Sequence, residues 1–175
     1  MEGQLEMQRL ELLVGPIASG KSTYCRQAAA DGKIILNDDA IVTALHGGDY
    51  RLYSELLKPL YKAVENQIVM GALMMGKTVV VDRPNHSKQM RKRYIALAHS
   101  FDCEVDVVMF KREKPEIHAL RRFNSDSRGH SMEYWIKVAK YHDSLYEPPD
   151  PEHEHFDKVV EWEFPGNERG QARQD

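Results

Sequence analysis

The feature that most constrains this chain is the stretch GPIASGKS, Gly15 to Ser22, which lies between the apolar run LELLV and the helix-like run TYCRQAAA. It matches the pattern Gly-x-x-x-x-Gly-Lys-Ser in full, with the strand before it and the helix after it that the pattern requires. Glycines allow backbone N–H groups to wrap around phosphates, and the helix offers the positive end of its dipole. The stretch therefore predicts a nucleotide-binding phosphate loop, a P-loop.

The residue types in this loop predict separate roles. We expect Lys21 to neutralise phosphoryl charge during catalysis and the Ser22 hydroxyl to bind Mg²⁺. ATP and Mg²⁺ are therefore the expected cofactors. The expected nucleotide contacts come from Gly15, Ala18, Ser19, Gly20, Lys21, Ser22 and Thr23.

Strands and helices alternate along the chain. Short apolar runs predict strands at residues 9–14, 33–36, 78–82 and 104–110 and in KVVEW near the C-terminus. A long helix is predicted over 52–75, because apolar residues recur at three- and four-residue spacing: Leu56, Leu57, Leu60, Val64, Ile68 and Ala72. Right-handed crossovers between such strands predict an α/β fold of the P-loop NTPase type. It has three layers, a parallel sheet covered by helices on both faces, with a small arginine-bearing lid.

The length of 175 residues and the 42% apolar content suit one domain with a single core. We expect a flexible leader at 1–8, a kinase domain at 9–164 with its lid at about 121–131, and a disordered tail at 165–175. No apolar run approaches the roughly 20 residues needed to cross a bilayer. The expected location is the cytoplasm, the host's if a phage encodes the chain, without membrane contact. Cys25 and Cys103 are expected to be buried thiols.

Acidic residues follow two of the predicted strands, where open α/β sheets bind ligands. Asp38 is the candidate general base for an acceptor hydroxyl, with a plain helix N-cap as the alternative. Asp39 is expected to face solvent in the first turn of the helix. Asp82 ends TVVVD and is placed to reach the metal shell or the acceptor, with a strand-end turn residue as the alternative.

Arginines bracket the polar break RRFNSDSRG, where Arg121, Arg122 and Arg128 could swing onto a transferring phosphoryl group. The chain lacks the Asn/Thr-Lys-x-Asp base-reading motif, which argues against a GTPase switch. His153 and His155 lie in an acidic, proline-bounded loop and are expected to be solvated.

A local basic patch lies in SKQMRKRY, where a predicted helix begins and brings together Lys88, Arg91, Lys92 and Arg93. The net charge of -3 gives no global basic field, so any contact with nucleic acid has to come from such a patch. The helix could track a phosphate backbone, or it could be a solvated charged face.

Four of these stretches together resemble the kinase domain of phage and bacterial end-repair polynucleotide kinases, in the zeta-toxin-like group of P-loop kinases: LLVGPIASGKST, LNDD, VVVDRPN and LRRFNSDSRG. The resemblance covers about residues 10–146. It implies that Asp38 activates the acceptor hydroxyl, with a possible role at the metal, and that Asp82 organises the acceptor side. It also implies that Arg122 and Arg128 are catalytic lid residues. Arg83, Lys88 and Arg91 complete the acceptor-binding candidates.

One position departs from the family pattern. The family commonly has an arginine three residues beyond the catalytic aspartate, to hold an acceptor phosphate, and this chain has Ile41. Arg83 or Arg51 would have to replace it. Some similar phage kinases phosphorylate a hydroxymethyl group on a pyrimidine inside DNA, an acceptor that would suit this loss.

We therefore expect an ATP-dependent kinase acting on a hydroxyl of a nucleic acid, with DNA favoured, or of a nucleotide-like acceptor. The alternatives are a small-molecule, nucleoside or nucleotide kinase and, from a different class, a noncatalytic nucleotide-binding module. The acceptor, the donor base and the oligomeric state stay open at this point.

Overall fold

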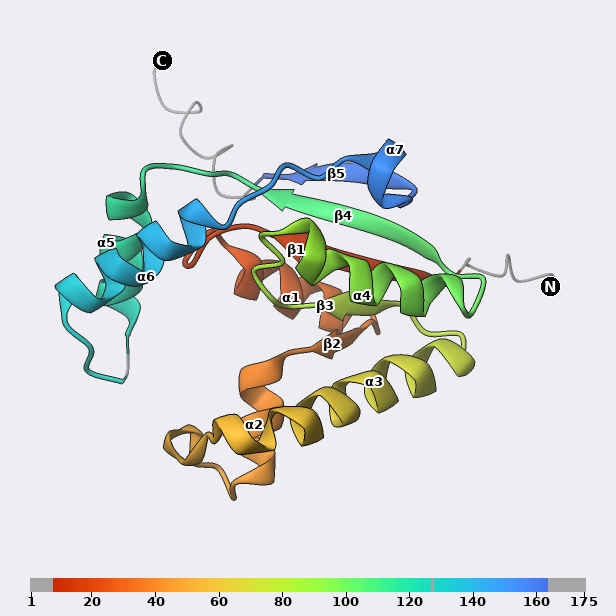
Figure 1. Ribbon diagram of the computed structural model, residues 1–175, viewed down its shortest axis with the longest axis horizontal. Helices are drawn as coiled ribbons and strands as arrows, with labels where there is room; N and C mark the ends of the chain where they lie inside the picture. The colour runs from red at the N-terminus through yellow and green to blue at the C-terminus, as the bar shows by residue number, and fades with distance from the viewer. Residues whose placement is uncertain (1–7, 127, 164–175) are drawn as a thin grey trace, which may run out of the picture.

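The computed structural model describes residues 8–126 and 128–163. Within these residues, five strands form one parallel sheet in the order β2, β3, β1, β4, β5 (Figure 1). The strands are β1 (Arg9–Val14), β2 (Ile34–Leu36), β3 (Val79–Val81), β4 (Glu104–Phe110) and β5 (Lys158–Trp162). Because β1 pairs with both β3 and β4, the phosphate loop leaves the sheet at its centre.

Helices connect successive strands, as a parallel sheet requires. They are α1 (Lys21–Ala30), α2 (Asp38–Leu45), α3 (Lys58–Met74), α4 (Lys88–His99), α5 (Pro115–Ser125), α6 (Met132–Ser144) and α7 (Pro151–Glu154). Two short 3₁₀ turns precede α3, η1 (Tyr50–Leu52) and η2 (Glu55–Leu57). None of the helices in the described part of the chain is long and apolar enough to cross a membrane.

The central strands are buried on both faces. Leu12 of β1 packs with residues of α3 and α4 in one apolar cluster. Its neighbour Leu13 points to the other face and packs with Cys25 and Ala28 of α1. This alternation confirms the predicted three-layer fold. Cys25 and Cys103 are buried free thiols, as expected.

Local signals place several helix starts where the sequence predicts them. The Asn37 side chain accepts a hydrogen bond from Ala40 N and caps α2, so Asp38 is the first helical residue and not the cap. Ser87 caps α4 through Met90 N, and Pro115 begins α5. The Asp38 carboxylate is therefore not used in capping this helix.

The prediction for the helix around α3 is wrong at its start. The chain forms two 3₁₀ turns first, and α3 begins only at Lys58, with Pro59 in its first turn. Leu56 lies outside the helix and is 89% exposed. The buried stripe of α3 is Tyr61, Glu65, Val69 and Leu73.

Helices α5 and α6 lie side by side beyond the carboxyl ends of the strands (Figure 1). Ala119 and Trp135 form a small apolar cluster there, against which Ile17 of the phosphate loop packs. The helix pair is therefore in contact with the loop that it is predicted to cover. The bounds of the lid stay a prediction. The leader, apart from Gln8, and the tail lie outside the described residues.

Candidate functional site

The phosphate loop has an unusual backbone because it must expose its N–H groups. Gly20 has a φ of 104° and Ala18 a φ of 49°, both in the left-handed region. A Cβ atom on Gly20 would lie 2.7 Å from the Trp162 ring, and one on Gly15 would lie 2.7 Å from Cβ of Phe110. The loop is thus packed against β4 and β5 at positions where only glycine fits. The first turn of α1 follows directly, with its N–H groups at the loop.

Lys21 is folded back onto this loop. Its Nζ donates to the carbonyl oxygens of Gly15 at 2.8 Å and Pro16 at 2.6 Å. Burial lowers the pKa of Lys21 to about 8; the nearby Arg122 adds to this effect, and the Asp82 carboxylate opposes it. The amine therefore lies close to both Asp82 and the lid.

Asp82 lies just after β3, as predicted, and its carboxylate faces the loop side of the sheet. It accepts a hydrogen bond from Asn37 Nδ2 at 2.8 Å. Burial, and then the Asp82 charge, raise the pKa of the Cys25 thiol to about 12. Ser22 follows Lys21 in the chain, so a hydroxyl and a carboxylate are available near the loop. Mg²⁺ prefers such oxygen ligands and needs few of them from protein when phosphates supply the rest. The donor set fits Mg²⁺.

Asp38 lies beside Arg83 at the start of α2. Arg83 Nη2 and Asp38 Oδ2 are 3.0 Å apart. Burial raises the pKa of Asp38, and the Arg83 charge opposes that rise. A raised pKa makes a carboxylate a better proton acceptor, so the position and environment suit a general base.

The lid arginines point to different places. Arg122 lies over the Trp135 ring at 4.9 Å and lines the cavity that holds Lys21. Arg128 Nη2 lies 2.8 Å from Asp39 Oδ2, and its guanidinium stacks over the Tyr50 ring at 4.4 Å. Asp39 lies in the first turn of α2 as expected, with its side chain 47% exposed, and its carboxylate also pairs with Arg128.

Two cavities meet at the phosphate loop. One, of about 910 Å³, is lined by Lys21, Asp38, Asp82, Arg122 and Arg128 among others, and we call it the acceptor cavity. The other, of about 890 Å³, lies on the far side of the loop, and we call it the donor cavity.

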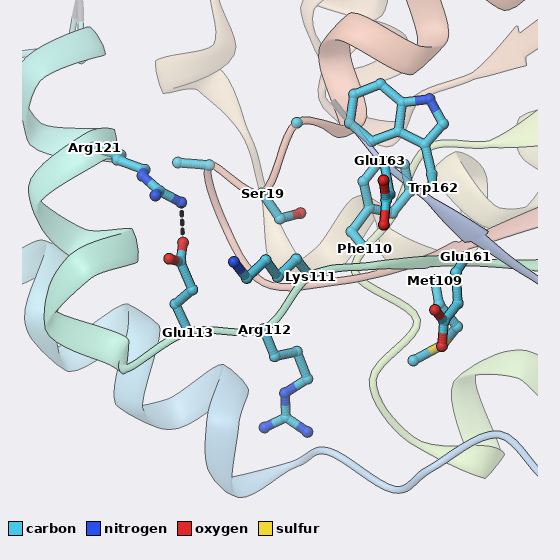
Figure 2. A pocket seen from close by; sticks show the side chains of 12 residues that line it. Ser19, Met109, Phe110, Lys111, Arg112, Glu113, Arg121, Glu161, Trp162 and Glu163 are labelled. Atoms are coloured by element: carbon cyan, nitrogen blue, oxygen red, sulfur yellow. Dashed lines mark hydrogen bonds and ion pairs between the residues drawn. The ribbon is translucent and has the colours of Figure 1, made fainter. Parts of the chain in front are cut away.

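The donor cavity is lined by residues of the loop, of β4 and of β5. Figure 2 shows Arg121 reaching across it to the carboxylate of Glu113, with Lys111 nearby and Trp162 against the loop. Arg121 is therefore turned away from the acceptor cavity. Arg122 and Arg128 are the lid arginines that line that cavity.

The basic helix is used differently from the expectation. Arg91 is fully buried, and its guanidinium donates to Glu154 at 2.7 and 2.8 Å and to the carbonyl oxygens of Asn85, His86 and Glu147. This contradicts the prediction that Arg91 contacts the acceptor, because all its donor nitrogens are engaged within the fold. The Lys88 amine is half exposed and lies 3.9 Å from Asp150, and Lys88 does not line either cavity.

Sequence reasoning missed two residues of this region, Glu65 and Lys62, and gave Arg93 only as a member of the basic patch. Glu65 of α3 is 3% exposed, and its carboxylate accepts from Arg93 Nη2 at 2.6 Å and from the Tyr94 hydroxyl at 3.0 Å. Arg93 and Lys62 line the acceptor cavity. The available signal was a single charged residue, Glu65, on the apolar stripe of a helix.

Two other candidates, His153 and Arg51, line neither cavity. His153 Nδ1 lies 2.7 Å from Asp150, in α7, and no group of three metal-ligating side chains occurs in the described ranges. Arg51 pairs with Asp49, with its side chain 89% exposed, and lines neither cavity. Arg83 is the arginine near Asp38, and Ile41 is buried in the core.

Comparison with solved structures shows the fold. A chain of the Pnkp1/Rnl/Hen1 RNA repair complex matches with a TM-score of 0.61 and 18% identity over 83% of this chain and 48% of that chain. A gluconokinase from Sinorhizobium meliloti 1021 matches with 0.55 and 19% over 95% and 88%. The Mycobacterium tuberculosis APS kinase CysC, in complex with AMPPNP and APS, matches with 0.58 and 15% over 94% of both chains.

These likenesses show a P-loop kinase fold, and this chain spans less than half the length of the repair-complex chain. Comparison with curated proteins gives no match. A model of the family described as AAA domain matches residues 10–133, more than half of the sequence, and the chain therefore belongs to the AAA domain family.

Proposed function

We propose that this protein is a kinase that moves the γ-phosphate of ATP onto a hydroxyl of a nucleic acid. The hydroxyl is that of a 5′ end or that of a hydroxymethyl group on a modified pyrimidine in DNA. The observation that carries the proposal is the placement of Asp38 in the cavity that also holds Lys21 and the lid arginine Arg122.

The donor side follows from the loop. ATP would place its phosphates on the loop and its base in the donor cavity, where Trp162 offers aromatic surface. Lys21 would exchange two carbonyl oxygens for phosphate oxygens. Ser22 and Asp82 would hold Mg²⁺, which would supply positive charge to neutralise the phosphates.

On the acceptor side, the two carboxylates and the arginines of the predicted lid would have separate roles. Asp38 would take the proton of the acceptor hydroxyl. Asp82 would hold the Asn37 side chain in place through their hydrogen bond and would contribute to the metal site. Arg122 would stabilise the charge on the transferring phosphoryl group, and Arg128 would release Asp39 to join it. Most of the catalysis would come from positioning and charge neutralisation.

The first test is phosphate transfer from γ-labelled ATP with Mg²⁺ to a matched set of acceptors. The set is 5′-hydroxyl DNA and RNA, DNA blocked at its 5′ end that carries hydroxymethylpyrimidine, free nucleosides, and nucleotides. Label on the 5′-hydroxyl strands or on the blocked DNA supports the proposal and names the acceptor. Label on none of the strands contradicts it.

The second test changes the base. Asp38→Asn should lower the transfer rate by about 10²-fold or more, because proton acceptance is lost. The affinity for ATP should be unchanged, because Asp38 lies outside the phosphate loop. Lys21→Ala should abolish transfer, and Asp31→Asn, at the exposed end of α1, is the matched control. A fully active Asp38→Asn enzyme would overturn the assignment, and ATP binding without any transfer would support a noncatalytic module.

A kinase of a small phosphorylated molecule is the second candidate. The observation that favours it is the use of the basic helix: Arg91 is buried and Arg93 binds Glu65, which leaves few exposed cations to track a strand. The double variant Lys88→Ala/Lys92→Ala separates the two. It should raise KM for a long 5′-hydroxyl strand if nucleic acid is the acceptor, and should leave transfer to a mononucleotide unchanged if a small molecule is.

A further inference from the structure

Glu65 is a buried carboxylate on the core side of α3, between Tyr61 and Val69 in the stripe. Removing a carboxylate from water costs several kcal/mol unless charged partners surround it. Glu65 has two such partners, Arg93 Nη2 at 2.6 Å and Arg83 Nη1 at 3.3 Å. One carboxylate therefore fixes two guanidiniums in one place.

The two arginines are not buried with it. Their side chains are 32% exposed for Arg83 and 29% for Arg93, and both line the acceptor cavity. Arg93 also donates to the neutral Asn66 Oδ1 at 2.9 Å. Both side chains therefore stay partly exposed at the cavity, although the carboxylate that they share is buried.

The charged residues on this wall of the acceptor cavity carry a net positive charge. Lys62, one turn before Glu65, lines the same cavity and has no ion pair within the described residues. With Lys62, Arg83 and Arg93 set against Glu65 and Asp38, one positive charge is left over. The surplus grows when Asp38 accepts a proton from an acceptor. The wall thus favours an anion.

We propose that Lys62, Arg83 and Arg93 form a binding site for a phosphate group carried by the acceptor, with Glu65 as the positioning residue that holds the two arginines. This inference rests on the proposed function. Guanidinium groups in fixed orientations bind phosphate through paired hydrogen bonds. The site would do what an arginine at position 41 cannot do here, because Ile41 is buried in the core.

The site also narrows the acceptor. Arg83 pairs with both Asp38, at 3.0 Å, and Glu65, at 3.3 Å. A phosphate bound to Arg83 would therefore lie close to the hydroxyl that Asp38 receives. The 5′-hydroxyl and the 3′-phosphate of a nucleotide are close in this way, because one sugar carries both. A hydroxymethyl group on a base is farther from the nearest phosphate. We therefore favour the 5′-hydroxyl end.

The experiment measures binding without transfer, so it stands apart from the test of the proposed function. The full chain is saturated with AMPPNP and Mg²⁺ and titrated with thymidine 3′-monophosphate or thymidine in a calorimeter. Both ligands carry the 5′-hydroxyl, and they differ only in the 3′-phosphate. We expect the 3′-monophosphate to bind about tenfold tighter or more, since a hydrogen bond to a charged group contributes about that factor.

Variants assign the preference to residues. Lys62→Ala and Arg93→Lys should each lower the ratio of the two affinities several-fold, and Glu65→Gln should lower it with the affinity for AMPPNP unchanged. Lys77→Ala and Arg51→Lys are the matched controls, since both side chains lie outside the cavity. Should Glu65→Gln fail to fold, the two surface variants still decide the question, because neither removes the buried carboxylate.

Equal affinity of the wild-type protein for the two ligands would overturn the inference, and so would an unchanged ratio in both Lys62→Ala and Arg93→Lys. A preference that the control variants lose as well would also overturn it. If the 3′-monophosphate is preferred through these residues and no acceptor is phosphorylated, the anion site stands and the proposed transfer falls.

Discussion

Lys21 holds the phosphate loop closed on itself. Its amine donates to two carbonyl oxygens of the loop, so a nucleotide has to replace bonds that already exist. This arrangement limits the gain from each new phosphate contact and keeps the loop ordered. It also ties nucleotide affinity to the proton on Lys21.

The pH dependence of ATP binding follows from this. The pKa of Lys21 is lowered to about 8 by burial, and contact with phosphate raises it, so protonated lysine binds ATP and neutral lysine does not. The dissociation constant should be flat below about pH 8 and then rise by up to tenfold per pH unit. Calorimetric titrations with ATP between pH 6.5 and 9.5 measure it. Lys21→Arg, which stays charged in this range, should remove the break, and a flat profile in the wild type would contradict the prediction.

Some residues of the candidate site could be predicted from the sequence, and others could be identified only from the packing of the fold. Lys21, Asp38 and Asp82 follow strands in a parallel sheet, and any such sheet gathers these positions at one edge. Arg91 and Arg93 lie two apart in one basic run, yet one is buried and the other lines the cavity. That difference depends on Glu154 and Glu65, which arrive from distant parts of the chain.

At the scale of elements, α3 shows where periodicity misleads. The pattern of leucines continues through the 3₁₀ turns before the helix, but Pro59 favours the first turn of a helix and starts it there. Leu56 is consequently exposed, and the core side of the helix runs from Tyr61 to Leu73. The central strands β1, β3 and β4 were easier to predict, because they are mainly apolar and buried on both faces.

Stability should follow the observed stripe and not the predicted one. Leu73→Ala should lower the free energy of unfolding by about 2–5 kcal/mol, because Leu73 is fully buried in the main cluster. Leu56→Ala should change it by less than about 0.5 kcal/mol. Urea unfolding followed by circular dichroism measures both, and similar losses in the two variants would contradict the register of α3.

At the scale of the whole molecule, a pair of histidines joins helix α6 to the sheet. His86, after β3, is 3% exposed, and its ring lies 4.7 Å from that of His142 of α6. His86 Nε2 and His142 Nδ1 have no hydrogen-bond partner among the described residues. Arg91 donates to the His86 carbonyl oxygen, and Glu147 N does so at 2.9 Å. The contact between α6 and the sheet therefore consists of two neutral rings and of hydrogen bonds to the His86 carbonyl oxygen.

Acid should lower the free energy of unfolding through these two histidines. Burial lowers the pKa of His86 to about 3 and that of His142 to about 4, while both take up protons near 6.5 when the chain unfolds. The unfolded state thus binds more protons below about pH 6.5, and stability falls as the pH decreases from there. His142→Gln should reduce the loss between pH 7 and 4.5 by about 1 kcal/mol or more in urea unfolding. The exposed His99→Gln is the control, and equal pH dependence in wild type and His142→Gln would contradict this account.

The contact between Trp162 and the phosphate loop has one more consequence. The chain has two tryptophans: Trp162 packs against Gly20 of the loop, and Trp135 stacks under Arg122 of the lid. Indole emission changes with nearby charge and water, so the two rings are intrinsic fluorophores, one at the phosphate loop and one beside Arg122. Trp162→Phe and Trp135→Phe leave one fluorophore each. Stopped-flow mixing with nucleotide would then give the order in which donor arrival and lid rearrangement occur.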